Sequence, residues 1–237
     1  MKTGILVHGV HLQANGWDNI VWGKAPDMMG RIPKAIQMFF RFKPSVMYFG
    51  TSASEKDGVK EGQYIFNTLC IRKNELGDFS ILKETNDLSG LDIHPTPNGQ
   101  ISYEEDKTEV VIDTVSQNTQ EEILAAGEVF LKLGITEVVL VSSASHIPRC
   151  IRDAQIVYNN PKYGGKYKVL AQNLIAAPAD TCFDGSNYDS TVIFETPHRG
   201  GHISYPLNEK AKLLFQVKSE NLEKFGNDLD MLISKYA

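Results

Sequence analysis

The sequence predicts an α/β protein with a Rossmann-like, doubly wound and mainly parallel sheet that is flanked by helices and has long loop insertions. Short apolar runs rich in β-branched residues alternate along the chain with longer segments of helical periodicity. These runs are apolar throughout, as parallel strands buried on both faces usually are. Strand, helix and strand therefore follow one another as βαβ units, which place their strands parallel in one sheet.

The strand pattern occurs in residues 4–7, 46–49, 110–112, 137–141, 168–170 and 191–194. Helical periodicity occurs in residues 28–42, 58–73, 119–133, 147–158 and 208–236. The clearest helix is 119–133, where Ile123, Ala126 and Phe130 share one apolar stripe, and Gly134 follows as a stop signal. The segment 208–236 is expected to break near residues 225–227.

Two segments interrupt this repeat. Residues 84–108 are rich in turn-forming residues, which indicates a long loop that covers a site or is mobile. Within this loop, Asn98-Gly99 before residues 100–103 has the pattern of a hairpin turn. Residues 176–190 are also loop-like. We therefore expect residues 1–237 to form a single domain decorated by two large loops.

Composition excludes several classes of protein. The 237 residues include 24 Lys and Arg against 29 Asp and Glu, a formal net charge of -5, so generic nucleic-acid binding is not expected. No run approaches the ~20 apolar residues that span a bilayer, and the first apolar run is too short for a signal-peptide core. We expect a cytoplasmic protein with no membrane partner. Cys70, Cys150 and Cys182 are odd in number and widely spaced, which disfavours a disulfide framework.

Polar residues follow the predicted strands, and open α/β sheets bind their ligands at the carboxyl ends of their strands. The candidate ligand-binding residues are His8, Arg31, Gly50, Thr51, Ser52, Glu61, Asp113, Ser116, Asn118, Thr119, Ser142, Ser143, His198 and Arg199. The candidate catalytic residues are His146, Arg149 and Glu55. No metal site is expected, because His8 and His11 occur without a metal-ligand pattern.

His146 and Arg149 are three residues apart on the first turn of a predicted helix, so their side chains project beside each other. Positive charge opposes the dipole at a helix N-terminus. An anion held between these side chains and the free N–H groups would resolve the conflict. The alternative is that Arg149 pairs with Asp153 one turn later.

The other loops also have structural alternatives. Asn118 or Thr119 can cap the following helix, with Glu121 or Glu122 completing a capping box. Residues 197–202, which are rich in glycine, can form either a tight turn or a late part of the ligand site. The dinucleotide fingerprint, the phosphate-binding loop of NTPases and the serine nucleophile motif of hydrolases are all absent from the sequence.

Taken in order, four blocks resemble the YdcF/SanA/ElyC-like family of bacterial proteins, over about residues 4–160. The blocks are Gly30-Arg31 with Ala35; Gly50-Thr51-Ser52 followed by Glu55 or Glu61; Asp113-x-x-Ser116-x-Asn118-Thr119-x-Glu121; and Val141-Ser142-Ser143 with His146-x-Pro148-Arg149.

The resemblance implies a Rossmann-like fold. Soluble members of the family resemble proteins that bind S-adenosylmethionine, and its membrane-anchored members are linked to cell-envelope integrity. This chain resembles the soluble branch. It departs from the family at Asp113, where Glu is usual, at Glu122, where Asn is usual, and at Cys150, where Ala is usual. Residues 84–108 resemble an insertion, and residues beyond about 165 are unmatched.

These observations favour a soluble small-molecule-binding protein of the YdcF-like type. Its ligand would be an anion of nucleotide type, either S-adenosylmethionine or a phosphorylated metabolite. S-adenosylmethionine offers Arg149 and His146 only its carboxylate, which favours a phosphorylated ligand.

Two alternatives stay open. One is a hydrolase or transferase acting on a phosphoester-type substrate, with His146 as acid/base and Arg31 and Arg149 stabilising negative charge. In that enzyme a nearby carboxylate would orient the histidine or hold a divalent ion, the candidates being Glu55, Glu61 and Asp113. The other is a non-catalytic interaction protein that uses residues 84–108 as its contact surface.

Overall fold

The computed structural model describes residues 1–95, 99–182 and 219–236. The chain divides into two units, Met1–Val192 and Ile193–Ala237. The candidate residues His198 and Arg199 and the predicted strand 191–194 lie outside the described residues.

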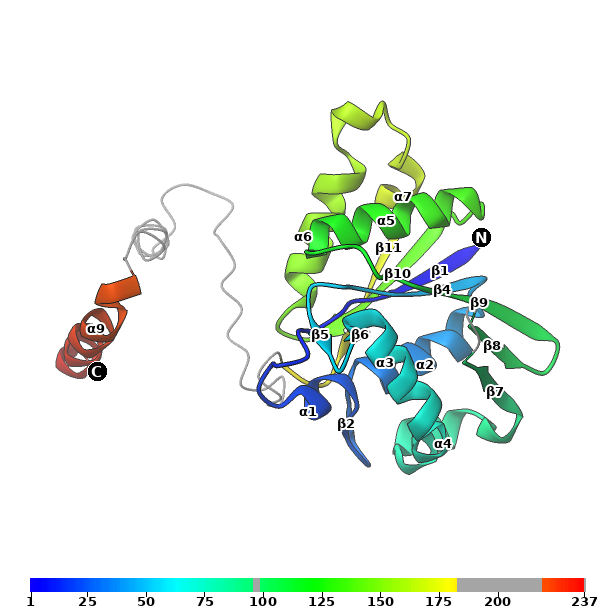
Figure 1. The fold of residues 1–237 in the computed structure, drawn as a ribbon, viewed down its shortest axis with the longest axis horizontal. Helices are drawn as coiled ribbons and strands as arrows, with labels where there is room; N and C mark the ends of the chain where they lie inside the picture. The colour runs from blue at the N-terminus through cyan, green and yellow to red at the C-terminus, as the bar shows by residue number, and fades with distance from the viewer. Residues whose placement is uncertain (96–98, 183–218, 237) are drawn as a thin grey trace. The chain divides into compact units, whose positions relative to one another are not determined.

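The first unit is built on a seven-stranded sheet with the order β11-β10-β1-β4-β9-β8-β7 (Figure 1). Its parallel strands are β1 (Thr3–Val7), β4 (Val46–Phe49), β9 (Asp106–Ile112), β10 (Glu137–Ser143) and β11 (Leu174–Ala179). Beyond β9 the sheet continues antiparallel through β8 (Gln100–Tyr103) and β7 (Leu91–His94). The class is therefore α/β with a mostly parallel central sheet, as predicted, and it is compatible with a Rossmann-like fold. The doubly wound arrangement stays a prediction.

Helices flank this sheet because successive residues of a strand face opposite sides. Ile5 and Val7 of β1 belong to an apolar cluster with residues of α2 (Arg31–Phe42) and α3 (Glu61–Arg72). Leu6, between them, belongs to a second cluster with residues of α5 (Thr119–Lys132) and α6 (Ile147–Tyr158). Because both sides of β1 are covered, all five of its residues are buried and apolar side chains are favoured along the strand.

Shorter elements connect these parts. They are α1 (Trp17–Val21), β2 (Gly23–Lys24), β3 (Met28–Met29), β5 (Glu55–Lys56), β6 (Val59–Lys60), η1 (Lys73–Asp78), α4 (Ser80–Thr85), η2 (Leu88–Gly90), η3 (Pro161–Tyr163) and α7 (Lys168–Gln172). β2 pairs with β3 and β5 with β6, each as a small antiparallel ribbon.

The prediction of a strand at residues 168–170 is wrong, because these residues begin the helix α7. The strand comes instead at β11, whose last four residues, 176–179, fall in the segment 176–190 that the sequence predicts to be a loop. β11 contains three alanines and Pro178, residue types that are uncommon in strands, so its sequence does not resemble a strand. Proline is tolerated there because β11 is an edge strand of the sheet.

Residues 84–108 are also not a long loop. They contain η2, β7, β8 and the first part of β9, which form the antiparallel side of the sheet. The predicted hairpin is confirmed, since Leu91 pairs with Tyr103 and His94 with Gln100. Part of the turn, residues 96–98, lies outside the described residues.

Two predictions about helices are also wrong, one about where a helix begins and one about a break within a helix. Met28–Met29 form β3, so the helix predicted for residues 28–42 begins at Arg31. In the second unit, η6 (Ser219–Asn221) leads into α9 (Leu222–Tyr236), which passes through Gly226 without the predicted break. An interior glycine costs a helix only about 1 kcal/mol, which the surrounding residues can offset.

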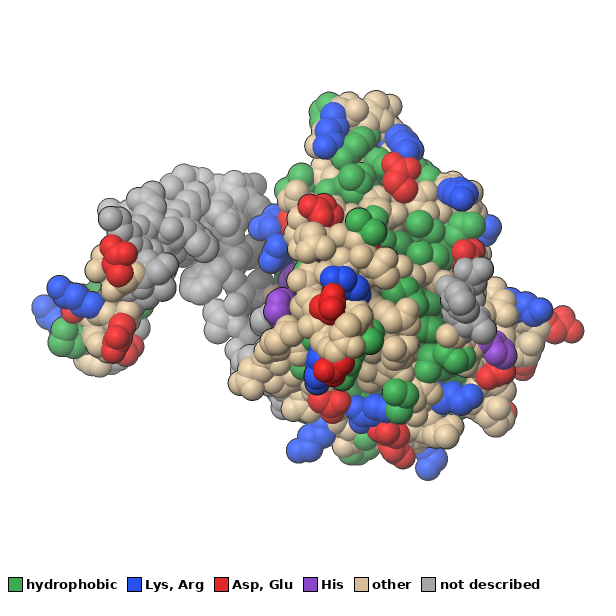
Figure 2. All heavy atoms as spheres, in the orientation of Figure 1, with side chains coloured by type: hydrophobic (Ala, Val, Ile, Leu, Met, Phe, Trp, Pro, Cys, Tyr) green, Lys and Arg blue, Asp and Glu red, His purple; other side chains and the backbone are tan. Residues whose placement is uncertain are grey.

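None of the helices in the described residues combines the length and apolar character that crossing a bilayer requires. On the face shown in Figure 2, Lys and Arg side chains are interspersed with Asp and Glu side chains. The mildly negative net charge therefore does not gather into a field of one sign on the described part of that face.

Candidate functional site

Four neighbouring parallel strands, β10, β1, β4 and β9, end at the same edge of the sheet. His8, Gly50 and Asp113 directly follow β1, β4 and β9, and Ser142 and Ser143 are the last two residues of β10. Because parallel strands share one carboxyl edge, residues from distant parts of the sequence meet there. We call this set of residues the carboxyl-edge site.

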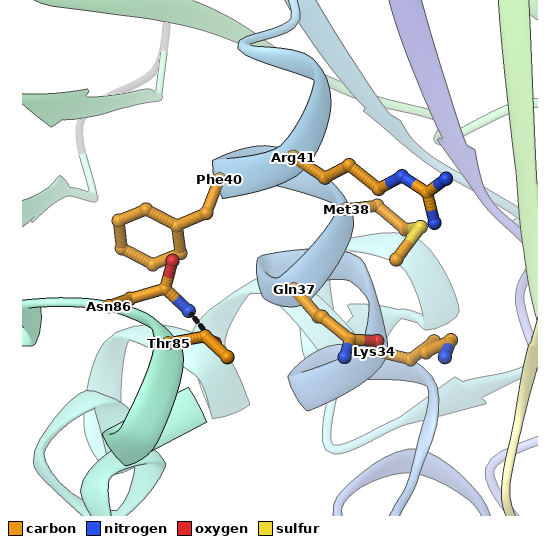
Figure 3. Close-up of a pocket in the computed structure, with 7 residues that line it drawn as sticks. All are labelled: Lys34, Gln37, Met38, Phe40, Arg41, Thr85 and Asn86. Atoms are coloured by element: carbon orange, nitrogen blue, oxygen red, sulfur yellow. Dashed lines mark hydrogen bonds between the residues drawn. The ribbon is translucent and has the colours of Figure 1, made fainter. Parts of the chain in front are cut away.

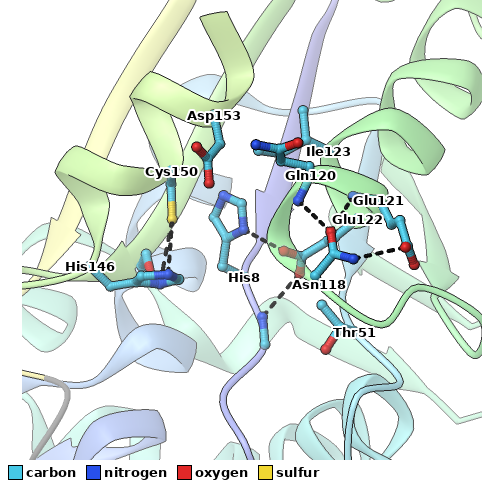
Figure 4. A network of polar contacts seen from close by, with 12 residues as sticks. His8, Thr51, Asn118, Gln120, Glu121, Glu122, Ile123, His146, Cys150 and Asp153 are labelled. Carbon is cyan, nitrogen blue, oxygen red and sulfur yellow. Dashed lines mark hydrogen bonds and ion pairs between the residues drawn. The ribbon is translucent and has the colours of Figure 1, made fainter. Parts of the chain in front are cut away.

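His8 forms a buried pair with Glu122 of α5 at the centre of this site (Figure 4). Its Nδ1 lies 2.6 Å from Glu122 Oε2, and both side chains are almost inaccessible to solvent. Burial disfavours the imidazolium, but Cys150 and Glu122 together outweigh it and raise the pKa of His8 to about 10. His8 Nε2 is buried and has no hydrogen-bond partner among the described residues.

The Glu122 carboxylate is packed tightly against backbone. Its Oε1 accepts a hydrogen bond from the Gly9 N–H at 3.1 Å. A Cβ atom on Gly50 would lie 1.9 Å from the same Oε1, so no other residue fits there without displacing the carboxylate. The glycine after β4 is therefore required by the close approach of Glu122.

Arg31, the first residue of α2, is fully buried at this edge. Its Nε donates to Ser143 Oγ at 2.9 Å, and its Nη1 donates to the carbonyl of His8 at 2.8 Å and to that of Gly9. Its Nη2 is buried and has no partner among the described residues. Burial lowers the pKa of Arg31, and Cys150, Glu122 and Glu61 oppose this effect. Since arginine stays protonated in proteins, Nη2 keeps its protons.

His146 precedes α6 and lies beside His8, with 6.2 Å between the ring centroids. Its Nδ1 lies 3.0 Å from Ser142 Oγ. It also lies 3.5 Å from Cys150 Sγ, the contact shown in Figure 4. Burial, together with the charges of Arg31, His8 and Arg149, lowers the pKa of His146 to about 2. His146 is therefore neutral at physiological pH, next to a protonated His8.

A second polar group follows β4. Buried Glu61, at the start of α3, accepts hydrogen bonds from Thr51 Oγ1 at 2.9 Å and from Ser54 Oγ at 2.6 Å. Burial raises the pKa of Glu61, although the two hydroxyl donors oppose it. A Cβ atom on Gly9 would lie 2.2 Å from Glu61 Oε1, so this carboxylate also approaches the turn after β1.

The remaining candidates on this side hold the loops together. Ser52 donates through its backbone N–H to the Ser116 carbonyl at 2.9 Å, and Asp113 Oδ1 accepts from the Ser116 N–H at 2.9 Å. Thr119, the first residue of α5, is buried. These contacts give the predicted residues a structural role, and their part in ligand binding stays a prediction.

Asn118 is the N-cap of α5, as the structural alternative predicts. Its Oδ1 accepts from the N–H groups of Gln120 and Glu121 at 3.1 and 3.0 Å. Glu121 does not form the predicted capping box, because its carboxylate accepts from the Gln117 N–H at 2.8 Å and from the Asn118 side-chain Nδ2 at 2.8 Å, not from the backbone N–H of Asn118. Glu122 does not cap the helix but contacts His8 instead.

Two described candidates, Glu55 and Arg149, do not join the centre of the site. Glu55 is exposed on β5 and pairs with Lys60 at 2.7 Å. Arg149 is more than half exposed, and its Nε lies 3.4 Å from Asp153 Oδ2, which is the predicted alternative pairing. His198 and Arg199 lie outside the described residues.

The start of α6 offers few free N–H groups to an anion. The N–H of His146 donates to the Ser143 carbonyl, that of Arg149 donates to the His146 carbonyl, and Pro148 has none. The buried unpaired donors lie instead on His8 and Arg31. Within the described ranges, no group of three or more His, Cys, Asp and Glu side chains is arranged to hold a metal ion.

Sequence reasoning missed Glu122 and Cys150 as members of the site. The signal for Glu122 was its position, because Glu122, Ala126 and Phe130 follow one another at i, i+4 and i+8 on the buried face of α5. A carboxylate at such a position needs a buried partner. Cys150 occupies the equivalent buried face of α6.

The fold and the site together define an α/β protein with a polar, largely buried network at the carboxyl edge of a mostly parallel sheet. The chain matches no family model, no curated protein and no solved structure. The resemblance to the YdcF/SanA/ElyC-like family therefore stays a prediction.

Proposed function

We propose that the chain binds a small anionic metabolite at the carboxyl-edge site. The class includes nucleotide-type and phosphorylated compounds, and also S-adenosylmethionine, which would present its carboxylate. One observation supports this proposal above the others: His8 Nε2 and Arg31 Nη2 are both buried and both lack a hydrogen-bond partner in the described part of the chain.

The protonation states of His8 and Arg31 indicate which kind of ligand atom they can bind. With Nδ1 engaged by Glu122 and a pKa raised to about 10, His8 presents Nε2 as a donor at neutral pH. Arg31 Nη2 is a donor in every protonation state that proteins reach. A buried donor without an acceptor costs about 1–3 kcal/mol. Phosphate and carboxylate oxygens are acceptors, and their hydrogen bonds to charged donors are stronger than neutral ones.

Thermal unfolding with inorganic phosphate, adenosine monophosphate and S-adenosylmethionine tests this proposal. A ligand at 100 times its Kd adds about 2.7 kcal/mol of stability, which raises the Tm of a chain this long by roughly 5–10 °C. Arg31→Lys keeps the charge but removes the forked donor, and His8→Gln removes the imidazolium, so each should reduce the shift. Arg152→Gln removes an exposed arginine of α6 and is the matched control. The absence of a shift with every compound refutes the proposal.

A second candidate function is a hydrolase or transferase acting on a phosphoester-type substrate. The observation that favours it is the 2.6 Å contact between His8 and Glu122, in which a carboxylate fixes one ring nitrogen and leaves the other for the substrate. In this candidate His8 donates the proton as a general acid in place of His146, because His8 is protonated at neutral pH, whereas the lowered pKa of His146 leaves that residue without a proton to donate from an imidazolium.

Turnover of para-nitrophenyl phosphate by His8→Gln and His146→Gln distinguishes the two histidines. If His8 transfers the proton, His8→Gln should lower kcat by about 100-fold or more, and His146→Gln should lower it less. Equal turnover by His8→Gln and the wild-type chain would remove His8 from the reaction. Phosphate binding without any turnover would support the first candidate function alone.

A further inference from the structure

The outer face of α2 carries two cations, Lys34 and Arg41. Lys34, Gln37 and Arg41 are spaced at i, i+3 and i+7 and therefore share one side of the helix. Neither Lys34 nor Arg41 forms an ion pair with any described residue. Burial lowers the pKa of Lys34, Asp180 opposes this effect and Arg41 adds to it. The two cations are thus near enough to repel each other.

A cavity of about 370 Å³ opens beside this face (Figure 3). Across it from α2 lie Thr85 at the end of α4 and Asn86, whose side chains are joined by a hydrogen bond of 2.7 Å. Gln37 Oε1 is buried and has no hydrogen-bond partner among the described residues. This cavity therefore offers a ligand two positive charges and one hydrogen-bond acceptor that is not in use.

An adjoining cavity of about 200 Å³ is lined by three aromatic rings, those of Phe39, Phe40 and Tyr103, and by polar and charged side chains, among them Asp87 and the ion pair of Lys43 with Asp106. It shares Phe40, Thr85 and Asn86 with the first cavity, so the two form one groove. The Phe40 ring meets the rings of Phe39 and Tyr103 edge to face, with centroids 5.3 and 5.1 Å apart. Such walls suit an aromatic ring, which prefers edge-to-face neighbours.

We propose that this groove between α2 and α4 binds a small aromatic acid. Its acidic group lies against Lys34 and Arg41, an N–H or O–H donor faces Gln37 Oε1, and its ring packs on Phe40. Inorganic phosphate alone would leave the aromatic cavity empty, and a neutral aromatic compound would leave the two cations unpaired. Both halves of the groove are used only by a ligand that joins an anion to a ring.

This groove is separate from the carboxyl-edge site. Lys34, Gln37 and Arg41 line the groove, whereas Arg31 of the same helix bonds to His8, Gly9 and Ser143. The proposal therefore stands whether or not an anion binds at His8.

Fluorescence titration of the full chain with anilinonaphthalene sulfonate, an aromatic acid that brightens in apolar surroundings, tests the proposal. One saturable site is expected, with para-hydroxybenzoate competing and inorganic phosphate not competing. Lys34→Gln and Arg41→Gln should each weaken binding by about 5-fold or more, since each removes a charged partner of the acid. Phe40→Ala should weaken it similarly by removing the aromatic wall.

Lys73→Gln is the matched control. Lys73 lines a different surface cavity, of about 340 Å³, and the substitution removes the same charge. Lys34 and Arg41 make no ion pair with described residues, so their variants should fold, which circular dichroism verifies. Unchanged binding by the Lys34→Gln/Arg41→Gln double variant would overturn the proposal, because the probe would then occupy another site. Equal loss in Lys73→Gln would also overturn it, as would displacement of the probe by inorganic phosphate.

Discussion

Replacing Glu122 with glutamine should remove the proton from His8. In the wild-type chain the carboxylate accepts from two donors, His8 Nδ1 and the Gly9 N–H. A glutamine has one acceptor and one donor at these positions. If its oxygen keeps the Gly9 hydrogen bond, its NH₂ group faces His8 Nδ1, which must then become an acceptor. His8 would therefore be neutral, with its proton on Nε2.

The size of the effect follows from burial. His8 is fully buried and the Glu122 side chain is 2% exposed, so solvent cannot replace the lost charge. Breaking a buried ion pair costs about 3–5 kcal/mol. We expect the lower end, about 3 kcal/mol, because the ring can lose its proton and avoid remaining as an unpaired buried charge. That loss corresponds to roughly 6–12 °C in Tm.

The raised pKa of His8 determines how the contribution of the His8–Glu122 pair to stability changes with pH. The pKa of His8 is about 10 in the folded chain and about 6.5 in the unfolded chain. Since the folded state binds the extra proton between these values, the contribution of the pair is complete below pH ~6.5 and is lost as pH rises through about 10. The stabilities of the wild-type chain and Glu122→Gln should therefore converge at high pH.

Urea unfolding between pH 6 and 10 measures this difference, and ¹⁵N NMR of the histidine ring reports which nitrogens are protonated. Glu121→Gln is the matched control, because Glu121 is the neighbouring residue, is exposed and contacts Gln117 and Asn118 but not His8. The reasoning is refuted if both variants lose the same stability, or if His8 keeps both ring protons in Glu122→Gln at neutral pH.

Three further predictions concern the same edge of the sheet. His146→Gln should reduce the fall in the free energy of unfolding between pH 7 and pH 5. The folded pKa of His146 is about 2, so below pH ~6.5 this residue takes up a proton only on unfolding, which destabilises the wild-type chain at acid pH. Urea unfolding at pH 7 and 5 measures the fall, and an equal fall in the variant and the wild-type chain would contradict this. Gly50→Ala should cost about 1–3 kcal/mol by displacing Glu122, and in a double-mutant cycle with Glu122→Gln the two losses should be less than additive. Asn118→Ala should cost about 1 kcal/mol through loss of the cap, while Gln120→Ala, measured by the same urea unfolding, should cost clearly less.

The elements that the sequence predicts best are those whose pattern of apolar residues matches the way the element is buried in the fold. Residues 46–49 and 147–158 are found as β4 and α6 with the predicted bounds, because a fully buried strand is apolar throughout and a helix on one face of a sheet has one apolar stripe. The segment 168–170 is too short for periodicity to separate strand from helix. β7 alternates between buried and exposed residues at the sheet edge, so its pattern resembles that of a polar loop.

The site was predictable only in part. The edge of the sheet follows from the order of strands and helices, and so do His8, Arg31 and the loop residues after each strand. The partner of His8 does not follow, because Glu122 lies 114 residues away and the pairing depends on how α5 rotates against β1. For the same reason the sequence could not show that Arg31 bonds to the turn after β1 and leaves only Nη2 unpaired.

The hairpin of β7 and β8 protects the parallel part of the sheet from other chains. Residues of β9 pair with β4 on one side and with β8 on the other, and Glu109 is paired on both sides, with Val46 and Gln100. Without the hairpin, β9 would present a row of unpaired backbone N–H and C=O groups, which is a template for aggregation. The outer strand β7 is instead only four residues long and has exposed Asp92 and His94, features that discourage a further strand from adding to the sheet.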